Sequence, residues 1–133
     1  MLTKALLGIL TLELLSEIFS TVASIATPAW ALQLFNVPVL PETIALTFVL
    51  GLVFGFVTVI IGLAIYFVFT GSRMGWLLSY VLGMFWIVFG GSLAMVYGKI
   101  ENLYLDFLPG LIITTLTYFS ARRPHGAGPP AGR

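Results

Sequence analysis

The sequence predicts an all-α, polytopic membrane protein, a bundle of four transmembrane helices with both the N- and C-termini in the cytoplasm. Three observations support this class: 59% of the 133 residues are hydrophobic, only 8% are charged, and the mean hydropathy is +1.09. Soluble domains carry about 25% charged residues, so this composition does not suit a surface that faces water. We expect a multi-pass protein of the cell inner (plasma) membrane, with the lipid bilayer as its solvent.

The first predicted span covers about residues 5–26. At about 1.5 Å per residue, this run is long enough to cross a hydrocarbon core of about 30 Å. A secretory signal peptide has a similar layout, but Glu13 and Glu17 fall inside the apolar stretch and argue against one. A threonine and a proline come next, which is typical of a helix cap followed by the first helical residue. They predict an interfacial helix over residues 28–35.

The second and third predicted spans, at about residues 44–70 and 76–97, form a helical hairpin. Pro41 interrupts the pattern before the second span. Glu42 follows it, where a carboxylate is favourable beside the positive end of the helix dipole. Residues 71–75 (GSRMG) predict a tight turn, and such a short connection makes the third span run antiparallel to the second.

The last predicted span covers about residues 103–120. Asn102 is its expected cap, and Pro109 lies near its beginning. Residues 1–121 therefore make up the predicted membrane domain. Residues 122–133 are rich in proline and glycine and predict a disordered cytoplasmic tail.

The basic residues predict the orientation of the bundle. One membrane face has Lys4, Arg73, Arg122 and Arg123, whereas the other has Lys99 together with Glu42, Glu101 and Asp106. Cytoplasmic loops carry an excess of lysine and arginine, so this asymmetry places both termini in the cytoplasm.

The sequence offers few groups for cofactor chemistry or for binding nucleic acid. It has no cysteine, and its single histidine, His125, lies in the polar tail. The usual protein ligands of haem and transition metals are therefore missing from the spans. A net charge of +1 without a basic patch disfavours nucleic acid. We expect no metal, no cofactor and no nucleic-acid partner.

A polar stripe runs along the first predicted span. At about 100° per residue, its members share an arc of about 100°; they are Glu13, Ser16, Glu17, Ser20, Ser24 and Thr27. Toward the cytoplasm the same face becomes apolar. The stripe therefore predicts an outward-open cavity that ends at Glu13 and Glu17.

The two glutamates are candidate functional residues, because an ionised carboxylate at the centre of a span costs about 2.5–3.5 kcal/mol. No basic residue lies inside a predicted span, so we predict that at least one of the pair is protonated at neutral pH. The functional interpretation is a proton site, or an anchor for a cationic or hydroxyl-bearing ligand. The structural alternative is a pair of hydrogen-bond donors that joins the helices.

Small residues predict where helices pack closely. One narrow face of the second span carries Gly51, Gly55, Thr58 and Gly62. A groove of this kind admits a neighbouring helix. Two partners fit it: the polar stripe of the first span, or the face of the third span that carries Gly83 and Gly90. A lipid tail is a third candidate occupant.

On the last span, Asp106, Gly110, Thr114 and Thr117 lie within about 80° of arc. This face is available to the first span. Asp106, near the outer boundary, and Thr114 are therefore further candidates for residues that line the cavity.

The layout of the chain resembles the small four-helix bacterial membrane proteins of the DoxX-like kind. The shared features are a first span, the loop Leu34-Phe35-Asn36-Val37-Pro38, a glycine-bearing second span, a tight turn and a basic tail. Such proteins are mostly described as accessory membrane components. The resemblance therefore implies no catalytic residue.

Three functions remain open from the sequence. The first is a non-catalytic accessory subunit, or helix-packing partner, of a larger membrane assembly, with other subunits or a second copy as its partners. The second is binding or transport of a small lipophilic or cationic molecule, with a proton-coupled mechanism at Glu13 and Glu17. The third is an intramembrane isomerase that uses the carboxyl pair for proton transfer. The absence of a catalytic motif makes an enzyme the less favoured class.

Overall fold

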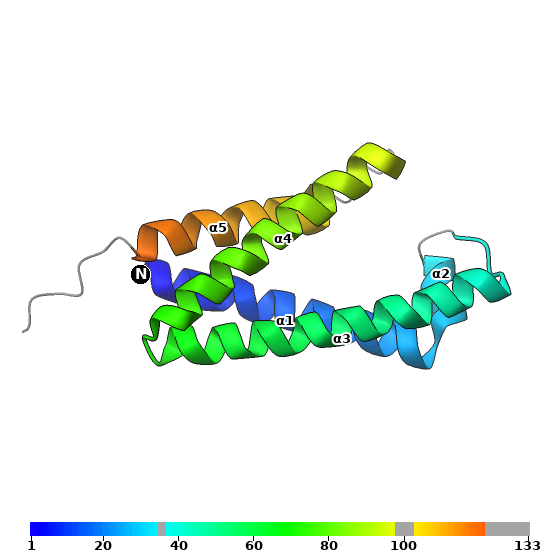
Figure 1. Ribbon diagram of the computed structural model, residues 1–133, viewed down its shortest axis with the longest axis horizontal. Coiled ribbons are helices and arrows are strands. Elements are labelled where there is room, and N and C mark those ends of the chain that lie inside the picture. Colours follow the sequence, from blue (N-terminus) through cyan, green and yellow to red (C-terminus); the bar gives the residue numbers. More distant parts are fainter. Residues whose placement is uncertain (35–36, 98–102, 122–133) are drawn as a thin grey trace, which may run out of the picture. The chain divides into compact units, whose positions relative to one another are not determined.

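The computed structural model describes residues 1–34, 37–97 and 103–121, and its regular elements are helical throughout (Figure 1). In chain order they are α1 (Leu2–Ala26), α2 (Pro28–Leu34), α3 (Pro41–Phe69), α4 (Arg73–Tyr97), the π-helix η1 (Leu103–Phe107) and α5 (Leu108–Ala121). The all-α class predicted from the sequence is confirmed.

Four helical segments of the described chain are long and apolar enough to cross a membrane: Leu2–Ala26, Pro41–Phe69, Arg73–Ser92 and Leu103–Ala121. Only 17–33% of the most apolar stretch of each is buried inside the protein. The remaining apolar side chains need a non-aqueous surrounding, and a bilayer supplies it. The protein is therefore a multi-pass membrane protein.

Local hydrogen bonds explain why α3 begins at Pro41, earlier than the predicted span. Proline suits the first helical position, where a backbone N–H has no partner in the helix. The Thr43 hydroxyl accepts a hydrogen bond from the backbone N–H of Leu40 at 2.9 Å and donates one to the carbonyl of Pro38 at 2.8 Å. Thr43 therefore caps the helix start. In a capping box, the third helical residue likewise accepts a hydrogen bond from the N-cap backbone N–H.

The turn between α3 and α4 depends on Gly71, whose φ is +72°. The N–H of Gly71 donates to the carbonyl of Val68 at 3.1 Å, and the N–H of Ser72 donates to that of Phe67 at 2.9 Å. These two bonds form the Schellman motif that ends many helices. Ser72 Oγ then accepts from the N–H of Met74 at 3.3 Å, so a helix stop and a helix start are adjacent in this turn.

The chain divides into two compact units, each described by itself. The first is Leu10–Leu63, which contains most of α1, all of α2 and most of α3. Within it, Gly51 lies against Ser24, and Gly55 lies against Thr21. Residue numbers rise along α3 as they fall along α1, so the two helices run antiparallel.

The second unit consists of Met1–Ile9 and Ala64–Arg133. In it α4, η1 and α5 pack together, and α4 and α5 lie side by side in Figure 1. Gly83 of α4 lies against Gly110 and Thr114 of α5, and Gly91 lies near Phe107. These contacts make α4 and α5 antiparallel too.

The last span begins as a π-helix, a feature that the sequence did not predict. Pro109 is the second residue of α5 and directly follows this segment. Proline has no N–H for an ordinary helical bond, and its ring clashes with the carbonyl four residues earlier in an α-helix. The π turn over Leu103–Phe107 directly precedes this proline, and local π adjustments re-satisfy the backbone groups that a proline frees in membrane helices.

Several predictions fall on residues that the structure does not describe. These are the Asn102 cap with the polar connection 99–102 that leads to it, the last residue of the predicted 28–35 helix, and the tail 122–133. The predicted orientation across the membrane also stays a prediction.

Candidate functional site

The two glutamates of α1 differ in burial. Glu17 is only 6% exposed, whereas Glu13, one helical turn earlier, is half-buried. Both side chains take part in interactions in the structure. The same helix therefore carries one buried carboxyl and one partly exposed carboxyl.

The other members of the polar stripe are also unequally placed. Ser16 is exposed and Ser20 is half-buried. Ser24 is buried, and Gly51 of α3 lies so close that a Cβ there would come within 2.9 Å of the Ser24 Cβ. Ser24 is therefore packed against α3, whereas Thr27, the last residue of the stripe, is exposed.

Thr21 is a polar residue of this region that the stripe did not include, since it lies just outside the predicted arc. Its methyl group would be 3.4 Å from a Cβ on Gly55, and its Oγ1 atom is buried without a hydrogen-bond partner in the described chain. Its position four residues after Glu17 and three before Ser24 is the signal that could have identified it.

The contacts between α1 and α3 fix the levels of the two glutamates. Ser24 meets Gly51 and Thr21 meets Gly55. One turn further along this antiparallel pair, Glu17 comes level with Thr58. One turn beyond that, Glu13 comes level with Gly62.

Gly62 differs from the two glycines that contact α1. A Cβ at Gly62 would meet no atom within 4 Å. There is thus open space on the glycine-bearing face of α3 at the level of Glu13, where Gly51 and Gly55 allow only close helix contact. A half-buried carboxyl in a membrane span, level with Gly62, is a candidate binding group.

Asp106 and Thr114 belong to the other compact unit. Asp106 lies half-buried in η1. Thr114 lies on α5 against Gly83, and its Oγ1 atom is buried without a hydrogen-bond partner in the described chain. On sequence alone, this face of α5 was available to the first span. In the structure it packs against α4 at Gly110 and Thr114.

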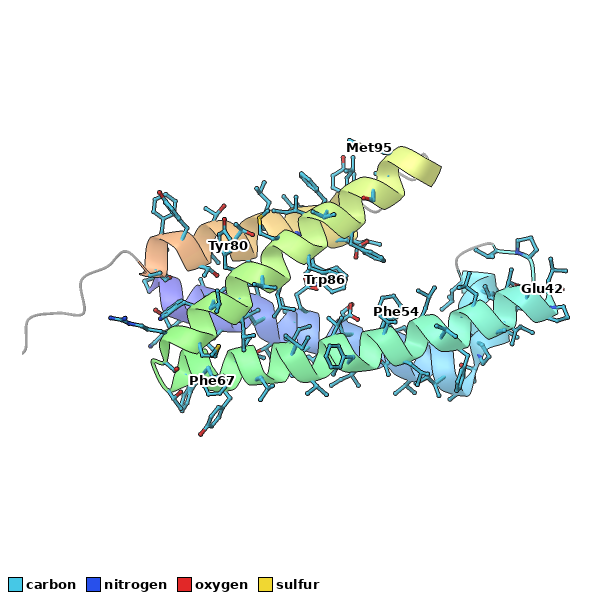
Figure 2. The ribbon with its side chains drawn as sticks, viewed as in Figure 1. Glu42, Phe54, Phe67, Tyr80, Trp86 and Met95 are labelled. Atoms are coloured by element: carbon cyan, nitrogen blue, oxygen red, sulfur yellow. The ribbon has the colours of Figure 1, made fainter. Side chains whose placement is uncertain are left out.

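Further buried polar groups occur on α4 and α5, and of these the sequence singled out Thr117 alone. The side chain of Trp86, labelled on α4 in Figure 2, is 2% exposed, as is that of Thr117. Trp86 Nε1, Thr117 Oγ1 and Ser120 Oγ have no hydrogen-bond partner among the described residues. Helical spacing alone does not distinguish such groups from ordinary packing residues.

The predicted packing glycines have different surroundings. Gly83 and Gly110 approach so closely that a Cβ on Gly110 would lie 2.7 Å from the Gly83 carbonyl oxygen. Gly90 is buried, whereas Gly62 faces open space. The groove of Gly51 and Gly55 is occupied by the α1 residues Ser24 and Thr21.

Comparisons with known proteins leave the family open. No family model, curated protein or solved structure matches the chain. Its four long apolar helices fit a small four-helix membrane protein, and the DoxX-like resemblance stays a prediction. No group of three or more His, Cys, Asp or Glu side chains that could hold a metal lies in the described part of the chain.

Proposed function

We propose that this membrane protein binds a small lipophilic cation at Glu13 and exchanges it for a proton. The observation that carries the proposal is the unequal burial of two carboxyls one helical turn apart, Glu17 at 6% exposure and Glu13 half-buried. Different environments give paired carboxyls different protonation states. The buried Glu17 keeps its proton, and the more open Glu13 ionises.

The charges of the unit support this division. Between Leu10 and Leu63 the chain has three carboxyls, Glu13, Glu17 and Glu42, and no Lys, Arg or His. Like charges one helical turn apart disfavour double ionisation, so one proton stays on the pair.

The surroundings of Glu13 favour a ligand with a positive charge on an apolar body. An ionised carboxylate in a low-dielectric region attracts a cation strongly. The open space at Gly62 leaves room at its level, and Ser16 presents an exposed hydroxyl one turn away. Since Ser24 packs closely against Gly51, the ligand enters from the side of the bilayer rather than along the stripe.

The test is binding of tetraphenylphosphonium to the protein in lipid nanodiscs. We expect this cation to raise the unfolding temperature more above neutral pH than below it, because protons compete for Glu13. Binding in weak buffer should release protons to the solution. Glu13→Gln should abolish both effects, since the amide cannot ionise.

Two control variants keep the test specific. Glu17→Gln mimics a protonated carboxyl and should retain binding. Glu42→Gln alters an exposed carboxyl at the start of α3 (Figure 2) and should also retain it. An equal temperature shift in Glu13→Gln and the parent protein would disprove the proposed function.

A second candidate is an accessory subunit of a larger membrane assembly, the role that the DoxX-like resemblance implies. The exposed Ser16 hydroxyl on a membrane span favours it, because hydroxyls join helices in lipid. Gentle solubilisation from native membranes followed by native mass measurement tests this role. Migration of the chain by itself would contradict it.

A further inference from the structure

Thr58 lies on the face of α3 that meets α1. Gly51, Gly55 and Thr58 fall within about 60° of arc on α3, and the two glycines contact Ser24 and Thr21 of α1. The antiparallel register then brings Thr58 level with Glu17. Thr58 is half-buried and Glu17 is buried, as expected for groups near a helix contact.

The hydroxyl hydrogen of Thr58 is already engaged. It is donated to the backbone carbonyl of Phe54, one turn earlier on α3, at 2.8 Å. A threonine hydroxyl has one hydrogen and two lone pairs. Toward α1, the Thr58 oxygen can therefore only accept a hydrogen bond.

An oxygen that only accepts distinguishes the two forms of a carboxyl group. A carboxylate is itself an acceptor and gains nothing from it, whereas a carboxylic acid has an O–H to donate. We propose that Thr58 is a positioning residue that accepts a hydrogen bond from the acid form of Glu17 and so holds the proton there. This inference rests on the proposed function, in which the proton on Glu17 leaves Glu13 to ionise.

The other titratable groups of α1, α2 and α3 do not supply this effect. On α1 they are Glu13 and, more than three turns away, Lys4; on α3 they are Glu42 and Tyr66, near its two ends; α2 has none. Glu13 is the near neighbour, and its charge disfavours a second carboxylate. Thr58 adds a direct donor–acceptor contact to that repulsion.

Infrared spectroscopy of the protein in nanodiscs tests the proposal. The C=O band of a protonated Glu17 is identified as the band lost in Glu17→Gln. We expect Thr58→Val, which keeps the shape and removes the hydroxyl, to shift this band, because the acid O–H loses its acceptor. Thr58→Ser should restore the band position, because serine can make the same bonds.

Thr47 provides a matched control, since its hydroxyl also donates one turn back, to the carbonyl of Thr43 at 2.7 Å. Thr47→Val should leave the Glu17 band unchanged. An unchanged band in Thr58→Val would overturn the proposal, as would the absence of any Glu17 acid band in the parent protein. Binding of tetraphenylphosphonium lost in Glu13→Gln would meanwhile still support the proposed function, so the two failures are distinguishable.

Discussion

At the scale of single residues, the main question is how polar side chains are accommodated in an apolar protein. Many hydroxyls of this chain donate to the backbone of their own helix, as Thr58 does to Phe54 and Ser79 does to Gly75. That bond removes the need for a partner on another helix. Hydroxyls without it, such as that of Thr117, carry an unpaired polar atom into the interior.

Thr117→Val is therefore expected to stabilise the protein. Valine has nearly the same shape, and the substitution removes a hydroxyl that is 2% exposed and has no partner in the described chain. An unpaired buried polar group costs about 1–3 kcal/mol, so the free energy of unfolding should rise by about 1 kcal/mol. Unfolding in mixed detergent micelles, followed by tryptophan fluorescence, measures the change.

The matched control is Thr115→Val, on the same helix at an exposed position. It should alter the unfolding free energy by less than half as much, since its hydroxyl is not buried. A loss of stability in Thr117→Val would mean that this hydroxyl has a hydrogen-bond partner, and would contradict the prediction.

At the scale of helices, close contacts depend on which glycines meet another backbone. Gly83 and Gly91 both lie on α4, but their neighbours differ. A Cβ at Gly83 would lie 2.9 Å from the carbonyl oxygen of Gly110, whereas one at Gly91 would lie 3.6 Å from the ring of Phe107. The first distance requires a backbone to move, and the second is an ordinary contact.

Gly83→Ala is accordingly expected to destabilise the pair of helices α4 and α5 by about 2 kcal/mol, the usual cost of adding a methyl group to a filled contact. Gly91→Ala should be neutral or stabilising, because alanine favours a helix by up to about 1 kcal/mol over glycine. Unfolding in detergent compares the two variants. Equal stability would show that the contact at Gly83 adapts without cost.

Helix number and type were predictable from the sequence, because apolar runs of this length have few alternatives in a protein. The α3–α4 turn was predictable as well, since Gly71 and Ser72 carry the signals of a helix stop and start. The partner of each helix face was not predictable. The groove of Gly51 and Gly55 suited α1 and the third span equally by residue size, and only the fold shows Ser24 and Thr21 lying in it.

The candidate site was predictable in part for the same reason. Helical spacing places Glu13 and Glu17 on one face. A carboxyl inside a membrane span is a candidate functional group by default. Their difference in burial depends on the neighbouring helix, which periodicity does not specify. Thr58 was visible as a member of a small-residue face, but its acceptor-only hydroxyl follows from the bond to Phe54.

At the scale of the whole molecule, large apolar side chains cover much of the described surface. Examples on α3 are Phe56, Val59 and Phe69, each more than half exposed. In water such a surface would aggregate, whereas in lipid it is the normal exterior of a membrane protein. The surface therefore supports insertion in a bilayer, and the distribution of basic residues predicts the direction of insertion.

The predicted orientation can be tested directly, because the chain contains no cysteine and every introduced thiol is unique. Both termini and the α3–α4 turn are predicted to be cytoplasmic, whereas the segment before α3 is predicted to face outward. A membrane-impermeant maleimide added to intact cells should therefore label Val39→Cys. Ser72→Cys should be labelled only after the membrane is opened.

Both positions suit labelling because they lie outside the helices, at Val39 before α3 and at Ser72 between α3 and α4. Since α3 is long enough to cross the membrane, the two thiols should always respond oppositely. Labelling of both in intact cells would contradict the span itself. Labelling of Ser72→Cys without Val39→Cys would keep the span and reverse the orientation, because the basic residues at that face would then lie outside the cell.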